Sequence, residues 1–204
     1  MNLYYIQGSC ALAPHIVAIE AGIPVQTIEV DFPTKTVVPS GADYLSVNPK
    51  GYVPALELDD GEVLTEAPVV VQYLADMKPE AKLAPANGTL ARARLQEALN
   101  YISTEIHQGY GPLFNPAAPA EVRAERPALL RKRYALLDKQ LEGRTYLFGD
   151  QFTAADALLF AMTRWAPGVG LDLSDYQNVQ TFQQAVAARS AVQTAMKAQG
   201  LLKD

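Results

Sequence analysis

Cys10 is the only cysteine among the 204 residues and the side chain best suited to sulfur chemistry. It follows the turn Gly8-Ser9 and precedes a segment with Pro14 in what should be the first turn of a helix. A thiol at a helix N-terminus faces unpaired N–H groups and the positive end of the helix dipole. These favour the thiolate and lower the pKa of the thiol. The alternative for a lone cysteine is burial as a small apolar residue.

The neighbours of Cys10 limit its chemistry. The run is Cys10-Ala11-Leu12-Ala13, without the second cysteine of a C-x-x-C motif, so a dithiol cycle within one chain is excluded. A single thiol can still form a mixed disulfide with an external thiol.

Two other motifs could hold an extended peptide ligand. If the Val53-Pro54 bond is cis, the backbone N–H and C=O of Val53 can pair with a peptide as an added strand. Thr65-Glu66-Ala67 is predicted to be a strand end that turns into a helix, where free N–H groups suit an α-carboxylate. Glu66 could bind the neighbouring α-amine. Its alternative role is to complement the helix dipole.

A third group of polar residues comprises Asn100, Thr104 and His107, at spacings that place them on one helix face. At about 100° per residue this face points away from the apolar stripe that includes Leu95 and Leu99, so the three residues should lie outside the core. The face could be merely solvated. His107 could also act as an acid–base group near neutral pH. His15, inside the first helix, is assigned a structural role.

The elements that must position these residues follow from hydrophobic patterning and turn residues. The first part of the chain is predicted to contain strand 2–6, helix 14–22, strand 25–30, hairpin strands 55–58 and 62–64, and helix 66–77. Residues 31–49 leave room for one short helix. The order β-α-β, linking stretch, β-β-α is typical of an α/β unit with parallel pairing at its start.

The rest of the chain is predicted to be helical, after a proline- and glycine-containing linker over 78–88. The predicted helices are 89–110, 121–141, 154–165, 178–188 and 190–199. We therefore predict two domains, residues 1–79 and residues 88–204. Thr153 and Asp156 match a capping box at the start of helix 154–165, a role in folding rather than catalysis.

Composition excludes several classes of protein. The net charge of −5 gives nucleic acid no electrostatic reason to bind, and no apolar run is long enough to span a membrane. The N-terminus shows no signal peptide, and one cysteine fits a reducing cytoplasm. Residues 1–80 are strongly acidic, so an anionic ligand there would need local positive charge such as Lys35 or Lys50.

Taken in order, these motifs resemble those of the bacterial beta-class cytosolic glutathione S-transferases, over essentially the whole chain. The resemblance rests on Cys10, Asn48-Pro49-Lys50-Gly51-Tyr52-Val53-Pro54-Ala55-Leu56, Leu64-Thr65-Glu66 and Phe152-Thr153-Ala154-Ala155-Asp156. It implies an α/β thioredoxin-like N-terminal domain, an all-α helical-bundle C-terminal domain, a cis Pro54 and a homodimer. It also implies the conjugation of glutathione to electrophiles, as in detoxification.

The resemblance also implies roles for individual residues. Val53, before Pro54, would pair through its backbone with the cysteinyl part of glutathione, close to Cys10. The γ-glutamyl end would meet Glu66 and the backbone of Ala67, and Lys35 would meet the glycine carboxylate. Asn100, from the partner subunit, and His107 would reach the active site, where Asn100 would help to bind glutathione. The family usually has Ser where this chain has Ala67, which leaves only the backbone N–H at that position.

We therefore predict an enzyme that uses glutathione as co-substrate, an apolar electrophile as second substrate, and no metal. The acceptor pocket should lie between the domains, near residues 110–114 and 165–169. Cys10 could instead form a mixed disulfide and give thiol-transferase or peroxidase activity, and Tyr5 and Ser9 are reserve candidates for activating the thiol. The alternatives are a non-catalytic binding protein on the same fold and a transferase specialised for one metabolite.

Overall fold

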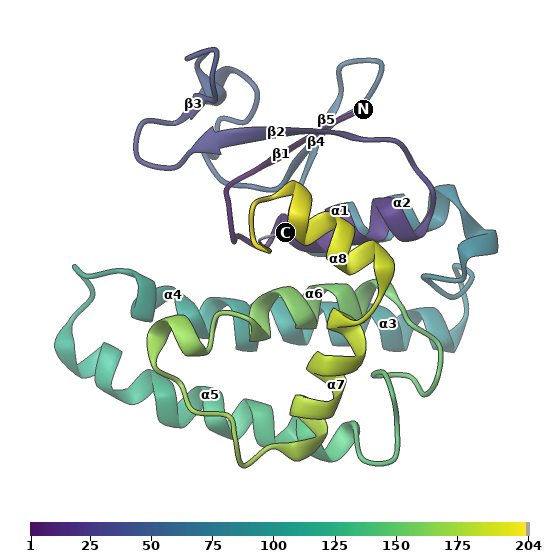
Figure 1. The fold of residues 1–204 in the computed structure, drawn as a ribbon, viewed down its shortest axis with the longest axis vertical. Coiled ribbons are helices and arrows are strands. Elements are labelled where there is room, and N and C mark those ends of the chain that lie inside the picture. The colour runs from purple at the N-terminus through teal and green to yellow at the C-terminus, as the bar shows by residue number, and fades with distance from the viewer. Residues whose placement is uncertain (203–204) are drawn as a thin grey trace.

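The computed structural model describes residues 1–202 as an α/β layer packed on a layer of helices (Figure 1). The α/β layer consists of β1 (Asn2–Tyr5), α1 (Leu12–Glu20), β2 (Gln26–Asp31), β3 (Thr36–Val37), β4 (Ala55–Glu57), β5 (Val63–Thr65) and α2 (Ala67–Met77). The later helices are α3 (Leu90–Tyr101), α4 (Gln108–Phe114), α5 (Ala120–Gln140), α6 (Ala154–Thr163), α7 (Gln177–Ala187) and α8 (Ser190–Ala198). Short 3-10 turns occur at Tyr44–Ser46, Pro79–Ala81 and Pro167–Val169.

The sheet has the strand order β3-β2-β1-β4-β5. The central strand β1 pairs parallel with β2 and antiparallel with β4, which places Leu3 opposite both Thr27 and Leu56. The β4–β5 hairpin turns near Gly61, whose φ of 89° suits glycine. Cys10 lies in the turn between the end of this central strand and the start of α1.

Helix α1 lies between the sheet and the helical layer (Figure 1). It begins two residues before Pro14, which still falls in its first turn, and it ends shortly before Gly22, whose φ is 65°. All residues from Leu12 to Ala18 are buried, because α2, α6 and α8 also pack on this helix. Burial on every side explains why α1 reads as apolar rather than amphipathic.

Helix α6 is the centre of the helical layer. All ten of its residues are buried, against α1 and α2 on one side and α3 and α7 on the others. The capping interaction predicted at its start is present: Asp156 accepts hydrogen bonds from the Thr153 and Leu147 backbone N–H groups, both at 2.8 Å. Asp156 is fully buried, so these donors replace the water it has lost.

The predicted helix over 89–110 departs from regular geometry in its middle. Residues Ile102–His107 form a π-helical segment between α3 and α4, in which Gln108 N–H bonds the carbonyl of Ser103. A π segment turns less per residue than an α-helix, so the side chains after it are rotated relative to those before it. A regular period therefore fails to predict the orientation of His107.

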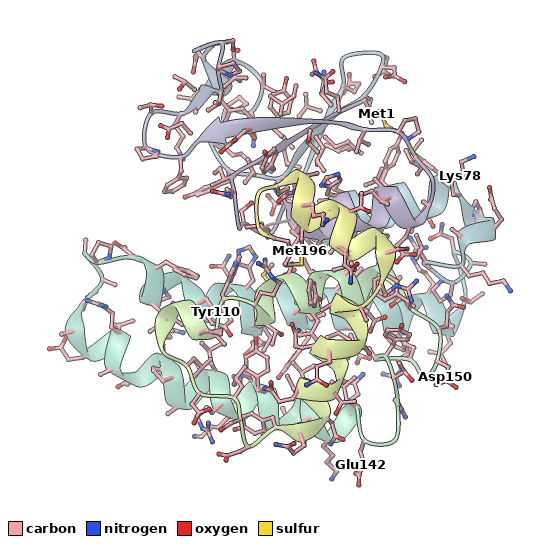
Figure 2. All side chains as sticks on the ribbon, viewed as in Figure 1. Met1, Lys78, Tyr110, Glu142, Asp150 and Met196 are labelled. Carbon is pink, nitrogen blue, oxygen red and sulfur yellow. The ribbon has the colours of Figure 1, made fainter. Side chains whose placement is uncertain are left out.

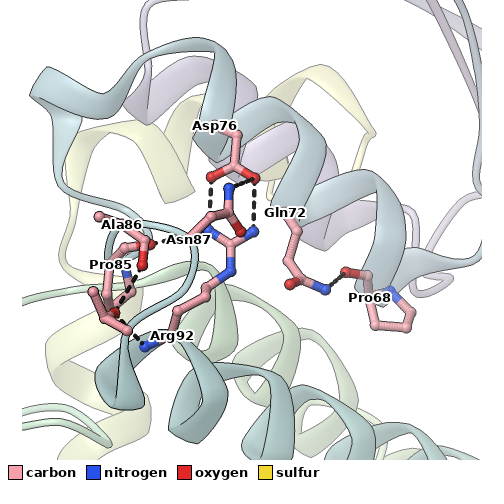
Figure 3. Close-up of polar contacts among 8 residues, drawn as sticks. Pro68, Gln72, Asp76, Pro85, Ala86, Asn87 and Arg92 are labelled. Carbon is pink, nitrogen blue, oxygen red and sulfur yellow. Dashed lines mark hydrogen bonds and ion pairs between the residues drawn. The ribbon is translucent and has the colours of Figure 1, made fainter.

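The segment between the two layers is held by an ion pair between the buried Arg92 and the exposed Asp76 (Figure 3). Both guanidinium nitrogens of Arg92, on α3, bond the carboxylate of Asp76, on α2, at 2.7 and 2.6 Å. Arg92 also bonds the Pro85 carbonyl at 3.1 Å, and its hydrogen bonds to Asp76 lower the pKa of that carboxyl. These contacts fix where α3 starts relative to α2.

The C-terminal part of the chain returns to the α/β layer. Arg189 makes a bidentate pair with Glu20 on α1, at 2.6 and 2.9 Å, and Gln199 contacts the ring of the buried His15. Figure 2 shows Met196, on α8, at the seam between the layers, where it belongs to a core cluster that spans both. The predicted fold class, a thioredoxin-like half followed by an all-helical half, is confirmed.

Candidate functional site

Cys10 lies at the seam, between the end of β1 and the start of α1. Its thiol donates a hydrogen bond to the carbonyl oxygen of Val53, with a sulfur–oxygen distance of 3.3 Å, and only 6% of the residue is exposed. Cys10 therefore contacts the backbone predicted to pair with a peptide ligand.

The prediction that the helix N-terminus lowers the pKa of this thiol is wrong. Burial raises the pKa of Cys10 to about 12, and the negative charge of Glu66 adds to the increase, whereas the local backbone hydrogen bond lowers it. Loss of water outweighs the helix N-terminus because Cys10 precedes the first helical residue and is closed off by Val53. The thiol is thus a neutral hydrogen-bond donor near pH 7.

The loop before β4 presents Val53. The Tyr52 carbonyl accepts bonds from the Tyr44 hydroxyl and the buried Asn48 amide, both at 2.7 Å, and Gly51 adopts a φ of 67°. The Val53-Pro54 bond is cis. Within residues 1–202 the Val53 N–H has no hydrogen-bond partner, so it can bond an added strand.

Glu66 sits at the turn into α2 with a φ of 70°, uncommon for a residue with a side chain. Its carboxylate is exposed and pairs with Lys50 at 3.0 Å, while Lys50 also bonds the Thr65 hydroxyl at 2.8 Å. Ala67 is the first residue of α2, and its buried methyl group offers no hydroxyl. The helix N-terminus, Glu66 and Lys50 thus bring positive and negative charge together at one exposed position.

Lys35 lies on the other side of the same loop. Its ammonium group bonds the Gly51 carbonyl at 2.9 Å and lies 3.7 Å from the centre of the Phe32 ring, with Tyr52 further away at 5.7 Å. The exposed rings of Phe32 and Tyr52 and the Gly51 carbonyl thus hold the Lys35 ammonium group close to the loop that carries Val53.

His107 is half-buried and packs on the Trp165 ring, with centroids 5.1 Å apart. Burial lowers its pKa, and the negative charge of Glu66 partly opposes the decrease. The imidazole is therefore neutral near pH 7 and close enough to Glu66 to feel its charge. The prediction that His107 shares an outward face with Asn100 and Thr104 is wrong. The π segment turns His107 inward, while Asn100 and Thr104 stay exposed.

Asn100 is not brought to the other predicted residues. Its carbonyl accepts a bond from the Thr104 hydroxyl at 3.1 Å, and its exposed side chain has no hydrogen-bond partner within residues 1–202. A role for Asn100 in a site built on one chain finds no support in this geometry.

An aromatic cluster lies beside His107. The Trp165 ring meets Tyr110 and Phe114 edge to face, at 5.6 and 5.3 Å, and its indole N–H bonds the carbonyl of Gly8 at 2.7 Å. Trp165 thereby joins the helical layer to the turn before Cys10. Residues 110–114 and 165–169 were predicted to line a pocket, but the Trp165–Gly8 bond had no signal in the sequence.

The reserve candidates are less well placed. Burial raises the pKa of Tyr5, with a contribution from Glu29, so its hydroxyl is a weaker acid than usual. The Ser9 hydroxyl accepts the Ala11 N–H at 3.3 Å, at the entry to α1. His15 is buried with a lowered pKa and contacts Gln199 at 3.3 Å, which agrees with a structural role.

Within residues 1–202, no group of three or more His, Cys, Asp or Glu side chains is arranged to hold a metal ion. No helix in this range has both the length and the apolar character needed to cross a membrane.

Comparison with known proteins places the chain. Residues 8–77 match the family model "Glutathione S-transferase, N-terminal domain", and residues 101–190 match "Glutathione S-transferase, C-terminal domain". Glutathione S-transferase GstA of Escherichia coli O157:H7 is 42% identical over 201 residues, covering 98% of this chain and 100% of the relative.

Solved structures agree. A sphingomonad glutathione S-transferase complexed with glutathione is 40% identical, with a TM-score of 0.94 over 99% of this chain and 100% of that chain. A beta-class enzyme from Sphingomonas chungbukensis is 41% identical, with a TM-score of 0.95 and the same coverage.

The chain belongs to the glutathione S-transferase family, with a thioredoxin-like half and a helical half. Within that family it is a beta-class glutathione S-transferase, an enzyme that acts on glutathione. The enzyme is thereby favoured over the non-catalytic binding protein considered from the sequence.

Proposed function

We propose that glutathione lies along Val53, between Cys10 and Glu66, and that its sulfur attacks an apolar electrophile held against the aromatic cluster. The contact of 3.3 Å between the Cys10 sulfur and the Val53 carbonyl oxygen carries this proposal. A cysteinyl residue paired with the Val53 backbone as an added strand has its side chain beside Cys10.

The ends of glutathione suit the two charged parts of the site. The γ-glutamyl α-carboxylate fits the Ala67 N–H at the start of α2, and the α-ammonium group fits Glu66, where it competes with Lys50. The glycine carboxylate fits Lys35, which carries its charge beside Gly51. An anionic peptide is thus compensated at both ends despite the acidic surroundings.

The reaction needs the thiolate of glutathione rather than that of Cys10. In this mechanism the neutral Cys10 thiol donates a hydrogen bond to the glutathione sulfur, in place of Val53, and stabilises its negative charge. The neutral imidazole of His107 takes the proton from glutathione. The thiolate then forms a bond to the electrophilic carbon, whose leaving group departs with the bonding electrons.

The mixed-disulfide route is less well supported. It requires the Cys10 thiolate to attack an external disulfide, forming one sulfur–sulfur bond and releasing a thiolate. With its pKa raised to about 12, Cys10 is almost wholly protonated near pH 7.

The proposal extends to a homodimer in the cytoplasm. A groove of about 350 Å³ between α3 and α5 carries two exposed apolar side chains, Leu136 and Phe148. Asn100 lies on the same helix α3 and is exposed, as a residue that reaches into a partner's site must be. A second copy covering this groove would bury the apolar groups, and one free thiol suits a reducing compartment.

The test combines binding and turnover. We expect calorimetry to show glutathione binding at millimolar concentration or better, and Val53→Pro, which removes the backbone donor, to weaken it. Because the Val53 side chain also packs against the cluster of Tyr4, Val30, Tyr44 and Ala55, the comparison is made at a temperature where both proteins are folded, as shown by their melting curves. Failure of the wild-type protein to bind millimolar glutathione would contradict the proposed site.

Sedimentation of wild type and Leu136→Glu tests the dimer, which the charged variant should weaken.

A further inference from the structure

A second pocket lies in the helical layer, between the end of α6, the loop 164–176 and α7. Its volume is about 640 Å³, and none of the residues assigned to glutathione lines it. Its polar lining residues are Thr163, Arg164, Asp172, Ser174, Gln180 and Gln183.

Arg164 is the unusual member of this lining. Its side chain is partly buried, yet it has no hydrogen bond and no ion pair within residues 1–202. Burial lowers the pKa of the guanidinium, with no acidic group acting on it. Its guanidinium is therefore a partly desolvated cation without a counter-ion, which leaves its N–H groups available to an anionic ligand.

Gln183 adds a second unpaired donor. Its amide nitrogen is shielded from solvent and bonds nothing within the described residues. Two further polar groups of the lining are already paired. The Gln180 amide donates to the Leu173 carbonyl at 3.0 Å, and the Thr163 hydroxyl donates to the Leu159 carbonyl at 2.8 Å. The pocket therefore lacks an acceptor rather than a donor.

Asp172 could have supplied this acceptor but is engaged elsewhere. Its carboxylate accepts the Ser174 N–H at 2.9 Å, and the hydrogen bonds from Ser174 together with the charge of Arg131 lower its pKa. Asp172 is exposed and charged at the rim, so a ligand with several negative charges would be repelled there.

We propose that this pocket binds a small organic monocarboxylate. Its carboxylate bonds Arg164 and, after a small rotation of the amide, Gln183. Its apolar body lies against Pro167, Leu171 and Leu173, which line the same pocket. A planar guanidinium suits a carboxylate because it can donate two parallel hydrogen bonds.

The experiment is an NMR titration of the full chain with sodium benzoate, against sodium chloride at equal ionic strength. We expect saturable shifts of the Arg164 Nε–Hε resonance and of the Leu171 and Leu173 methyl groups, in benzoate only. Arg164→Gln should weaken binding by about tenfold or more, the worth of one charge-assisted contact. Arg123→Gln, which removes an exposed arginine on α5, should bind like wild type.

A second variant keeps the proposal testable if Arg164→Gln unfolds. Gln183→Met preserves length and apolar packing and should weaken benzoate binding by about threefold to tenfold. Equal affinity in a folded Arg164→Gln variant would overturn the proposal. So would shifts centred on Trp165 and His107, which would place benzoate at the acceptor site, or the absence of any saturable shift.

Discussion

The Cys10 thiol and the Val53 carbonyl, 43 residues apart in sequence, are joined by a hydrogen bond of 3.3 Å. This bond connects the turn after β1 to the loop before β4. The thiol is buried at this junction, and its burial raises the pKa of Cys10 to about 12.

Replacing Cys10 tests whether it acts as a donor or as a nucleophile. We expect Cys10→Ala to lower kcat/KM with an aryl halide by about 10- to 150-fold, the worth of one hydrogen bond to a charged group. Cys10→Ser, which keeps a donor, should lose less. A loss beyond about 1,000-fold would instead indicate covalent catalysis by Cys10.

The raised pKa of Cys10 predicts slow alkylation of the free protein. Iodoacetamide reacts with thiolates, so the rate at pH 7 should lie far below that of free cysteine and rise as the pH approaches 12. Mass spectrometry of the intact chain, which has one cysteine, follows the reaction without interference. A rate equal to that of free cysteine would show that the thiol is exposed or ionised in solution.

His107 should titrate below the ordinary value of 6.5, because burial favours its neutral form. NMR titration of the imidazole in the free protein measures this pKa. Because the unfolded chain binds this proton more readily, stability should fall as the pH falls below about 6.5. A pKa above 6.5 in the folded protein would contradict the buried position.

Ala67→Ser should strengthen glutathione binding. A hydroxyl at the start of α2 adds one donor to the γ-glutamyl carboxylate, worth about 1.5–3 kcal/mol, or roughly tenfold to 100-fold in Kd. Calorimetry of both proteins gives the ratio, and Ser46→Ala, a hydroxyl change at an exposed position, serves as the control. Unchanged affinity would place the carboxylate elsewhere.

Asp156→Ala should mainly lower stability. It leaves the buried N–H groups of Leu147 and Thr153 without acceptors, at a cost of about 2–4 kcal/mol in the free energy of unfolding. Asp150→Ala, at an exposed position, should change it by no more than about 0.5 kcal/mol. Denaturant titration measures both variants. A normal melting temperature with lost turnover would instead assign Asp156 to the chemistry.

The sequence by itself determined the order of the elements and much of their length. Strand β1, helix α1, the β4–β5 hairpin and the capped start of α6 follow from local turn residues and from hydrophobic periods. Such signals involve residues that are close together in the sequence, so they can be recognised from the sequence alone. The positions of Cys10, Val53 and Glu66 at element boundaries could be predicted for the same reason.

Only the tertiary structure decided how these residues are charged and paired. The pKa of Cys10 depends on its enclosure by Val53, and the orientation of His107 depends on a π segment that no regular period predicts. The pairing of Lys50 with Glu66 and the bond from Trp165 to Gly8 join segments that lie far apart in sequence. Desolvation and pairing are properties of the packed chain, because they depend on what surrounds a group rather than on its neighbours in sequence.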